Sequence, residues 1–426
     1  MSSYILKKIG YGLLVLWGVV TLVFAIFSIN PGDPAAMLLG QRADEEAIER
    51  VRRELALDLP WHQQYALYLN DVSPLSVHSE EEGSRIYLDP EKYNYTQLLD
   101  FGETVLVVKT PYLRRSYQSK KQVSEIIAEA LPGTVVLAVG AIFFALFFGI
   151  LLGVVTAVNK GRFIDGFALF TAVLGMSAPS FFSAIIISWI GGYLWSAQTT
   201  LPAIPIVLAL IGLAISLFRK PRTWVKSVEW FIGGALIGLA LLVLNSLTAL
   251  LFDFNFLLFR HAALVLPGTG LNMTGSLYDV DVFTGEYLAL ENLILPMITL
   301  GIRPLAIVVQ LTRNALLEEL AKDYTRTARA KGLSPNAVVF KHALRNALNP
   351  VVTAVSGWFA SMLAGAVFVE FVFNWKGLGL QVFQSLQNDD FPVVMGSVLV
   401  IAASFVVINI FVDIIYGLLD PRVRVS

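Results

Sequence analysis

The stretch TVVLAVGAIFFALFFGILLGVVTAV, residues 134–158, contains no charged side chain. A helix that crosses the roughly 30 Å hydrocarbon core of a bilayer needs about 20 consecutive apolar residues. We therefore predict a membrane-spanning helix over this stretch, and the same criterion organises the rest of the chain.

The composition of the whole chain agrees with this prediction. Of the 426 residues, 56% are hydrophobic and only 15% are charged, whereas soluble domains contain about 25% charged residues. The net charge of −1 argues against a nucleic-acid partner, because such proteins carry a large positive surplus. The chain has no cysteine and four scattered histidines, so we expect no thiol chemistry, no metal site and no cofactor.

Eight runs in the chain are apolar and long enough to span a bilayer, and we predict an all-α polytopic membrane protein. They cover residues 9–29, 134–158, 167–195, 202–218, 230–252, 293–317, 350–373 and 393–419. The first run is too long for a signal peptide and lacks a small-x-small cleavage site, so we interpret it as a retained anchor. Pro179 and Pro296 are expected to kink their helices.

Lysine and arginine in short loops predict the orientation, because such loops stay on the cytoplasmic side. With a cytoplasmic N-terminus, every short inner loop is basic and the C-terminus is also cytoplasmic. The basic residues are Lys160, Arg162, Arg219, Lys220, Arg222, Lys226, those of residues 322–345, Arg422 and Arg424. The outer segments are acidic or mixed, and residues 31–131 are long enough for a small extracytoplasmic domain. Within it, residues 44–69 have the pattern of an amphipathic helix and residues 103–108 that of a strand.

The polar loop over residues 318–349 has the pattern of two short helices joined by a turn. Gly332 suits a left-handed helix end, Ser334 can cap a second helix, and Pro335 suits its first position. Small residues and arginines in this loop favour docking onto a partner protein. On composition alone, a basic loop that merely obeys the topology rule is an equal alternative.

Several motifs resemble one family. The segment Asp323-Tyr324-Thr325-Arg326-Thr327-Ala328-Arg329-Ala330-Lys331-Gly332, followed by His342-Ala343-Leu344-Arg345-Asn346-Ala347 and Pro350, resembles the EAA loop of ABC importer permeases, in particular the B-type permease of the dipeptide and oligopeptide branch. Further matches occur in order along most of the chain, at residues 29–34, 55–65, 116–132, 363–366, 377–379, 390–394 and 413–422. Arg326 and Thr327 stand where other branches have glutamate and alanine.

The resemblance implies a channel-forming subunit of an importer in the bacterial inner membrane, which moves di- or oligopeptides by alternating access. The implied partners are two ABC ATPase subunits that use ATP and magnesium, a second, C-type permease subunit, an extracytoplasmic substrate-binding protein and the lipid bilayer. The implied ATPase-coupling residues are Asp323, Tyr324, Arg326, Thr327, Ala328, Arg329, Ala330, Gly332 and Leu333.

This family has six spans, so we interpret residues 201–252 as an inserted transmembrane hairpin, which either faces lipid or contacts a partner. The predicted division of the chain is an anchor span (1–30), an extracytoplasmic segment (31–131), spans two and three (132–200), the hairpin (201–252), an extracytoplasmic loop (253–291), and a permease core (292–426) with the coupling loop at 318–349. We interpret residues 71–111 as an expansion relative to this family, which either touches a binding protein or forms a passive surface loop.

A charged residue inside a span is costly and needs a reason. Arg303, in the sixth predicted span, either attracts a peptide carboxylate in the pore or forms a structural ion pair or snorkels outward. Glu370 either pairs with Arg303 or shapes an outer gate. Together with Gly377 and Gly379 these are the candidate pore or gate residues.

Two other function classes are weighed against the permease. A secondary transporter or channel should show internal repeats or buried carboxylates along an ion path. A membrane enzyme should show a motif such as His-Glu-x-x-His. Neither pattern occurs, and no phosphate-binding Gly-x-x-x-x-Gly-Lys-Ser/Thr loop occurs either. We therefore predict that the chain is not an enzyme and that partner subunits hydrolyse the ATP. Dipeptides, oligopeptides, nickel chelates and haem are not distinguished as substrates.

Overall fold

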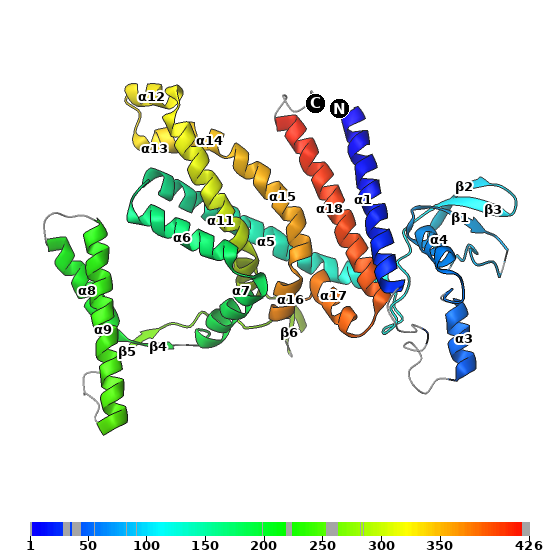
Figure 1. The fold of residues 1–426 in the computed structure, drawn as a ribbon, viewed down its shortest axis with the longest axis horizontal. Helices are drawn as coiled ribbons and strands as arrows, with labels where there is room; N and C mark the ends of the chain where they lie inside the picture. The colour runs from blue at the N-terminus through cyan, green and yellow to red at the C-terminus, as the bar shows by residue number, and fades with distance from the viewer. Residues whose placement is uncertain are drawn as a thin grey trace. The chain divides into compact units, whose positions relative to one another are not determined.

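The structure, a computed structural model, describes residues 2–28, 35, 44–54, 56–81, 83–90, 92–197, 199–218, 224–252, 263–281, 283 and 285–419. The first part of the chain forms α1 (Ser2–Ser28), α3 (Glu45–Glu54), α4 (Trp61–Val72), β1 (Leu75–Ser79), β2 (Tyr95–Asp100), β3 (Thr104–Lys109), α5 (Val123–Val158), α6 (Phe163–Ser177), α7 (Ser180–Ile187), the π-helical η1 (Ser188–Leu194), β4 (Thr199–Pro202), α8 (Ala203–Phe218) and α9 (Trp224–Phe252). The second part forms β5 (Ala263–Leu266), β6 (Tyr278–Asp281), β7 (Gly285–Leu288), α11 (Glu291–Ala321), α12 (Asp323–Ala330), α13 (Pro335–Ala337), the π-helical η2 (Val338–Ala343), α14 (Leu344–Ala347), α15 (Asn349–Gly365), α16 (Val367–Phe373), α17 (Leu378–Gln387) and α18 (Phe391–Leu419). Figure 1 shows these elements along the chain.

The described residues contain five helices that are long and apolar enough to cross a bilayer. They are Leu6–Ser28, Val123–Val158, Trp230–Thr248, Glu291–Ala321 and Phe391–Val412, and each coincides with a run predicted from the sequence. A polytopic helical membrane protein is therefore confirmed, whereas the count of eight spans stays a prediction.

The other three predicted runs differ from simple spans. Over residues 167–195, α6 and α7–η1 form a pair bent by 111°, because Ala178 and Pro179 adopt extended backbone conformations; the kink predicted at Pro179 is confirmed. Helix α8 has 16 residues, about 24 Å at 1.5 Å per residue, which is shorter than the hydrocarbon core. Residues 350–373 are divided between α15 and α16. By contrast, α11 continues as one helix through Pro296 and Pro304.

The described residues form two compact units, one of residues 1–139 and 356–426 and the other of residues 140–355. In the first unit α1 and α18 run side by side (Figure 1). Their apolar faces meet in a buried cluster that also receives Tyr68 of α4. The cluster consists of Val20, Val23, Phe24, Tyr68, Met395 and Leu399. This packing attaches the segment after α1 to the two terminal helices.

The segment after α1 contains more than one helix. The amphipathic helix predicted over residues 44–69 is wrong, because α3 ends at Glu54 and α4 begins at Trp61. Ala56 has φ 57°, and Pro60, which lacks an amide hydrogen, is extended before α4. The predicted strand is confirmed as β3, the central strand of an antiparallel sheet in the order β1-β3-β2. Leu88, Tyr93, Val105 and Val107 form the buried core of this sheet.

Lys109, at the end of β3, is 3% exposed. Its ammonium donates to the carbonyl oxygen of Asp71 at 2.5 Å and lies 4.6 Å from the centroid of the Tyr93 ring. Burial lowers the pKa of Lys109 to about 8, opposed by the Asp71 carboxylate and reinforced by the charge of Lys92.

This shift predicts that alkaline pH stabilises the fold. Between pH 8 and the unfolded pKa of about 10.4 the unfolded chain keeps a proton that the folded chain releases, so stability should rise by about 2 kcal/mol from pH 8 to 9.5. Above pH 10 Tyr93 and Tyr112, whose pKa values are raised by burial, should reverse the trend. The midpoint of thermal unfolding in detergent measures this. Lys109→Met should lose most of the slope and the exposed Lys121→Met should keep it; an equal slope in both variants would contradict the prediction.

In the second unit, glycines bring α5 and α11 into close contact. A Cβ at Gly149 would lie 2.7 Å from a methyl carbon of Val308, and one at Gly153 would lie 2.6 Å from the Cβ of Thr312. Such spacing leaves no room for a side chain, which agrees with the small-residue packing typical of membrane helices.

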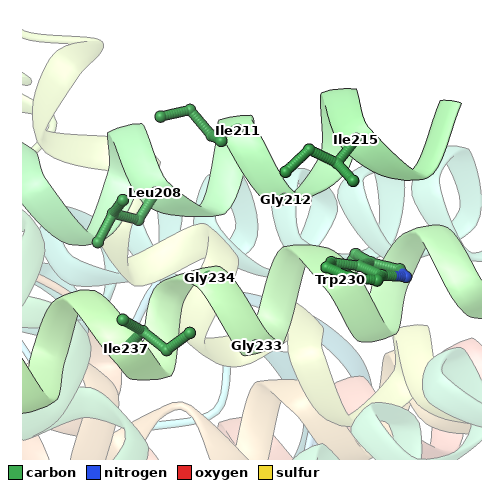
Figure 2. A pocket seen from close by; sticks show the side chains of 8 residues that line it. All are labelled: Leu208, Ile211, Gly212, Ile215, Trp230, Gly233, Gly234 and Ile237. Carbon is green, nitrogen blue, oxygen red and sulfur yellow. The ribbon is translucent and has the colours of Figure 1, made fainter. Parts of the chain in front are cut away.

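In the region of the predicted hairpin, α8 lies against part of the longer α9 (Figure 1); its assignment as an inserted transmembrane hairpin stays a prediction. A Cβ at Gly212 would clash with the carbonyl oxygen of Trp230, and one at Gly234 with that of Leu208. Figure 2 shows an apolar pocket of about 410 Å³ along this contact. It is lined by Leu208, Ile211, Gly212, Ile215, Trp230, Gly233, Gly234 and Ile237. The turn predicted at residues 219–222 lies outside the described residues, as do Arg422 and Arg424.

Candidate functional site

The first candidate site is the α12–α14 segment, residues 322–348, which follows the end of α11 (Figure 1). Lys322 is extended, with φ −72° and ψ 153°, so the chain leaves the axis of α11 before α12 begins. Buried Thr325 fixes this corner, because its hydroxyl donates to the carbonyl oxygens of Leu320 at 3.0 Å and Lys322 at 2.7 Å.

The turn after α12 is the one predicted from the sequence. Gly332 has φ 80°, a conformation that glycine adopts without a steric penalty. Ser334 accepts a hydrogen bond from the amide of Ala337 at 3.3 Å, and Pro335 occupies the first turn of α13. The helix, turn and second helix are therefore confirmed.

The two faces of α12 differ in exposure. Thr325 and Ala328 are buried, so the small size of Ala328 is explained by packing within the protein. The other predicted coupling residues are exposed. They are Asp323, Tyr324, Arg326, Thr327, Arg329, Ala330, Gly332 and Leu333. The only ion pair that the described residues show on this face joins Arg326 and Asp323 at 3.6 Å, a surface contact of little energetic weight.

Polar contacts join α12 to α11 and to α14. Tyr324 donates to the carboxylate of Glu319, Lys322 pairs with the same carboxylate at 2.6 Å, and Asn346 donates to the hydroxyl of Tyr324 at 3.2 Å. Burial, followed by the hydrogen bond to Glu319, raises the pKa of Tyr324, and the same carboxylate raises the pKa of Lys322. These hydrogen bonds and the ion pair hold α12 against the end of α11.

Apolar packing connects this segment to the membrane helices. Leu316 of α11 and Ala343 of η2 are fully buried, and with Val154, Ala157 and Ala347 they form one cluster. This cluster connects η2 and α14 to the ends of α5 and α11.

A buried ion pair, which the sequence analysis missed, joins α6 to α11 in the same unit. Arg313 donates to Asp165 through Nε at 2.6 Å and Nη2 at 2.8 Å, and Asp165 also accepts from the amide of Gly161 at 2.8 Å. Asp165 is 4% exposed. Ionisable residues at membrane depth need partners. Asp165 and Arg313, which have opposite charges and lie at the ends of two predicted spans, could therefore have been predicted from the sequence as a pair.

The second candidate site surrounds Glu370 in the first unit. Glu370 is fully buried, and its carboxylate accepts from the hydroxyl of Thr134 at 2.7 Å and from the amide of Leu380 at 3.0 Å. The carboxylate thus caps the start of α17, where unpaired amides favour an anion. A Cβ at Gly377 would lie 2.5 Å from this carboxylate, and one at Gly379 would lie 2.5 Å from the Cα of Val367. Both glycines are buried and allow this close approach.

Further contacts join distant segments of the first unit. Trp375 is fully buried and donates through Nε1 to the carbonyl oxygen of Gly133 at 2.9 Å. Asp390 accepts from the hydroxyl of Ser116 at 2.5 Å and from the amide of Tyr117 at 2.8 Å. The motifs at residues 116–132 and 390–394, far apart in the sequence, thus meet.

Arg303 is exposed on α11, and none of the described residues of its unit pairs with it. The role of Arg303 as a pore-facing cation and its pairing with Glu370 stay predictions. Among the described residues no group of three or more histidine, aspartate or glutamate side chains is arranged to hold a metal ion.

Comparison with known proteins identifies the family. Residues 149–425 match the family model of the binding-protein-dependent transport system inner membrane component, and residues 1–80 match the N-terminal model of the same membrane component. Over 426 residues the chain is 30% identical to the di/tripeptide transport system permease protein DppB of Pseudomonas aeruginosa, covering 100% of this chain and 99% of the relative. It is 28% identical over 424 residues to the dipeptide transport system permease protein DppB of Alkalihalophilus pseudofirmus, with all of both chains covered. It is also 28% identical over 424 residues to the glutathione transport system permease protein GsiC of Salmonella typhimurium, covering 100% of this chain and 99% of the relative. The chain belongs to the family of binding-protein-dependent transport system inner membrane components.

Proposed function

We propose that this chain is the channel-forming permease subunit of an ATP-driven importer of di- or oligopeptides. Full-length similarity to relatives named as peptide permeases supports the substrate class. The alternative, a secondary transporter or channel, does not account for membership in a family of binding-protein-dependent systems.

In this proposal the exposed face of α12 is the surface on which an ABC ATPase subunit docks. The observation that carries it is the contrast between the two faces of α12. One face is fixed by buried Thr325 and Ala328, while Arg326 and Arg329 are left exposed. Such an arrangement suits a helix that fits a partner groove and passes its movement to α5 and α11 through the packed cluster around Leu316.

The remaining assignments complete this proposal. The N- and C-termini and the α12–α14 segment lie in the cytoplasm, and the sheet β1-β3-β2 lies outside, where a substrate-binding protein delivers peptide. A C-type permease subunit completes the path, and two ATPases bind the ATP and magnesium. The α8–α9 hairpin is an addition to a six-span core, and the division of the chain at residues 30, 131, 200, 252 and 291 follows from this arrangement.

The test is peptide uptake by the complete transporter in proteoliposomes with ATP inside. The double reversal Arg326→Glu with Arg329→Glu should lower uptake by about tenfold or more, since an unfavourable charge contact of 1.4 kcal/mol already gives a factor of ten. ATPase subunits should also be lost on purification. The matched reversal Lys120→Glu with Lys121→Glu should leave both unchanged.

Two results would overturn the proposal. Uptake by the purified chain without any ATPase subunit would favour a secondary transporter or channel. Normal uptake and normal ATPase recovery in the double reversal at Arg326 and Arg329 would exclude this face as the docking surface.

A further inference from the structure

A polar pocket of about 340 Å³ lies beside the β1-β3-β2 sheet, in the chain segment between α4 and α5. Its lining residues include one lysine, two tyrosines, one asparagine, one glutamine and one threonine. The lining residues are Pro90, Lys92, Tyr93, Asn94, Tyr95, Thr110 and Gln122. No step of the transport proposal uses this pocket.

The ammonium of Lys92 is held in a fixed position at the pocket. It lies 4.7 Å from the ring centroids of both Tyr93 and Tyr112, a distance at which a cation is attracted to an aromatic face. Its side chain is 36% exposed. The cation is thus partly removed from water and still open to a ligand.

The nearby carboxylate neutralises Lys92 only in part. The Nζ atom lies 3.8 Å from Oδ1 of Asp71, beyond the length of a direct hydrogen bond. The same Oδ1 accepts from the hydroxyl of Tyr93 at 2.8 Å, and Oδ2 lies 3.5 Å from Nε of Arg114. Since an ammonium carries three donors, Lys92 keeps donors for a group in the pocket.

The local charge favours an anion. Among the described residues, the charged groups that act on Lys92 and Lys109 are Asp71, Asp89 and Arg114. Among these described groups, three cations therefore lie near two carboxylates. Burial lowers the pKa of Lys92, the Asp71 carboxylate opposes this shift, and the charge of Arg114 adds to it. A bound anion would offset part of the remaining cost of burying this cation.

We propose that this pocket binds a carboxylate group. Lys92 supplies the charge-assisted hydrogen bond to the carboxylate oxygens, and the side-chain amides of Asn94 and Gln122 and the hydroxyl of Thr110 can supply further donors. Two sources carry this chemistry: the free carboxyl end of a peptide, and an aspartate or glutamate side chain of a protein that docks on this segment.

Binding to the full chain in lipid nanodiscs, measured by saturation-transfer NMR, tests the proposal without ATP or partner subunits, so its outcome is independent of the proposed transport function. The probes are alanyl-phenylalanine and its C-terminal amide, and N-acetylglutamate α-amide and N-acetylglutamine α-amide. At least one acid should bind tenfold or more tightly than its amide. A preference confined to the first pair identifies a peptide carboxyl end, and one confined to the second identifies a side-chain carboxylate; both support the proposal.

Three variants identify the residue responsible. Lys92→Met should abolish the preference for the acid, Lys92→Arg should keep most of it, and Lys121→Met, which removes an exposed lysine of the same segment, should not change it. Equal binding of acid and amide by the unaltered chain would overturn the proposal. This result does not depend on whether the Lys92→Met variant folds. An undiminished preference in folded Lys92→Met would overturn it as well.

Discussion

Replacement of Arg313 by methionine is expected to lower the free energy of unfolding by about 3–5 kcal/mol, because it leaves a buried carboxylate without its counter-ion. Asp165, which is 4% exposed, would keep only the hydrogen bond from the amide of Gly161. Denaturant titration of the chain in detergent measures the loss. The same variant should also weaken peptide uptake, because the pair joins α6 to α11 directly before the α12–α14 segment.

Arg303→Met is the matched control for stability, since Arg303 lies on the same helix and is exposed. It should change the free energy of unfolding far less than Arg313→Met, because it leaves no buried charge without its counter-ion. The double variant Asp165→Asn with Arg313→Met should be more stable than Arg313→Met alone, because no unpaired charge remains. If Arg313→Met is no less stable than Arg303→Met, the ion pair contributes nothing to the fold.

Glu370→Ala should destabilise the first unit by a similar amount. Removal of the carboxylate leaves the hydroxyl of Thr134 and the amide of Leu380 without their acceptor in a fully buried site. Each buried donor without a partner costs about 1–3 kcal/mol. The start of α17 should therefore loosen, and hydrogen exchange at the amides of Gly379 and Leu380 should become faster.

Glu370→Gln separates the loss of hydrogen bonds from the loss of volume. Glutamine keeps one acceptor oxygen, although an amide group replaces the other. The Glu370→Gln protein should therefore be destabilised by less than the Glu370→Ala protein. Glu129→Ala is the control, because the side chain of Glu129 is 71% exposed and lies 3.9 Å from Lys121. Unchanged exchange at Gly379 and Leu380 in Glu370→Ala would show that the carboxylate does not hold α17.

The sequence predicted those features that depend on residues close together in the chain. Long apolar runs predict spanning helices because the bilayer fixes the length that a helix needs. The turn at Gly332, Ser334 and Pro335 was predictable because backbone conformation and capping are local properties. The break between α3 and α4 was overlooked, although Pro60 was a visible sign of it.

Contacts between distant residues were not predictable in the same way. Glu370 was singled out, but its partner Thr134 is 236 positions away and has no feature that marks it. Arg313 lies 148 positions from Asp165, and periodicity within one helix contains no information about a neighbour. Likewise, the sequence identified Ala328 as a small residue, whereas only the structure shows that it is buried beneath the exposed face of α12.

The docking of an ATPase subunit on α12 is the central claim, and a single introduced thiol tests it most directly. The chain has no cysteine, so Ala330→Cys on the exposed face of α12 gives a unique site for a short thiol-directed cross-linker. In the assembled transporter this variant should cross-link to an ATPase subunit, whereas Glu103→Cys, an exposed position before β3, should not. If the intact complex forms no cross-link from Ala330→Cys, or forms it equally from Glu103→Cys, α12 is not the docking surface.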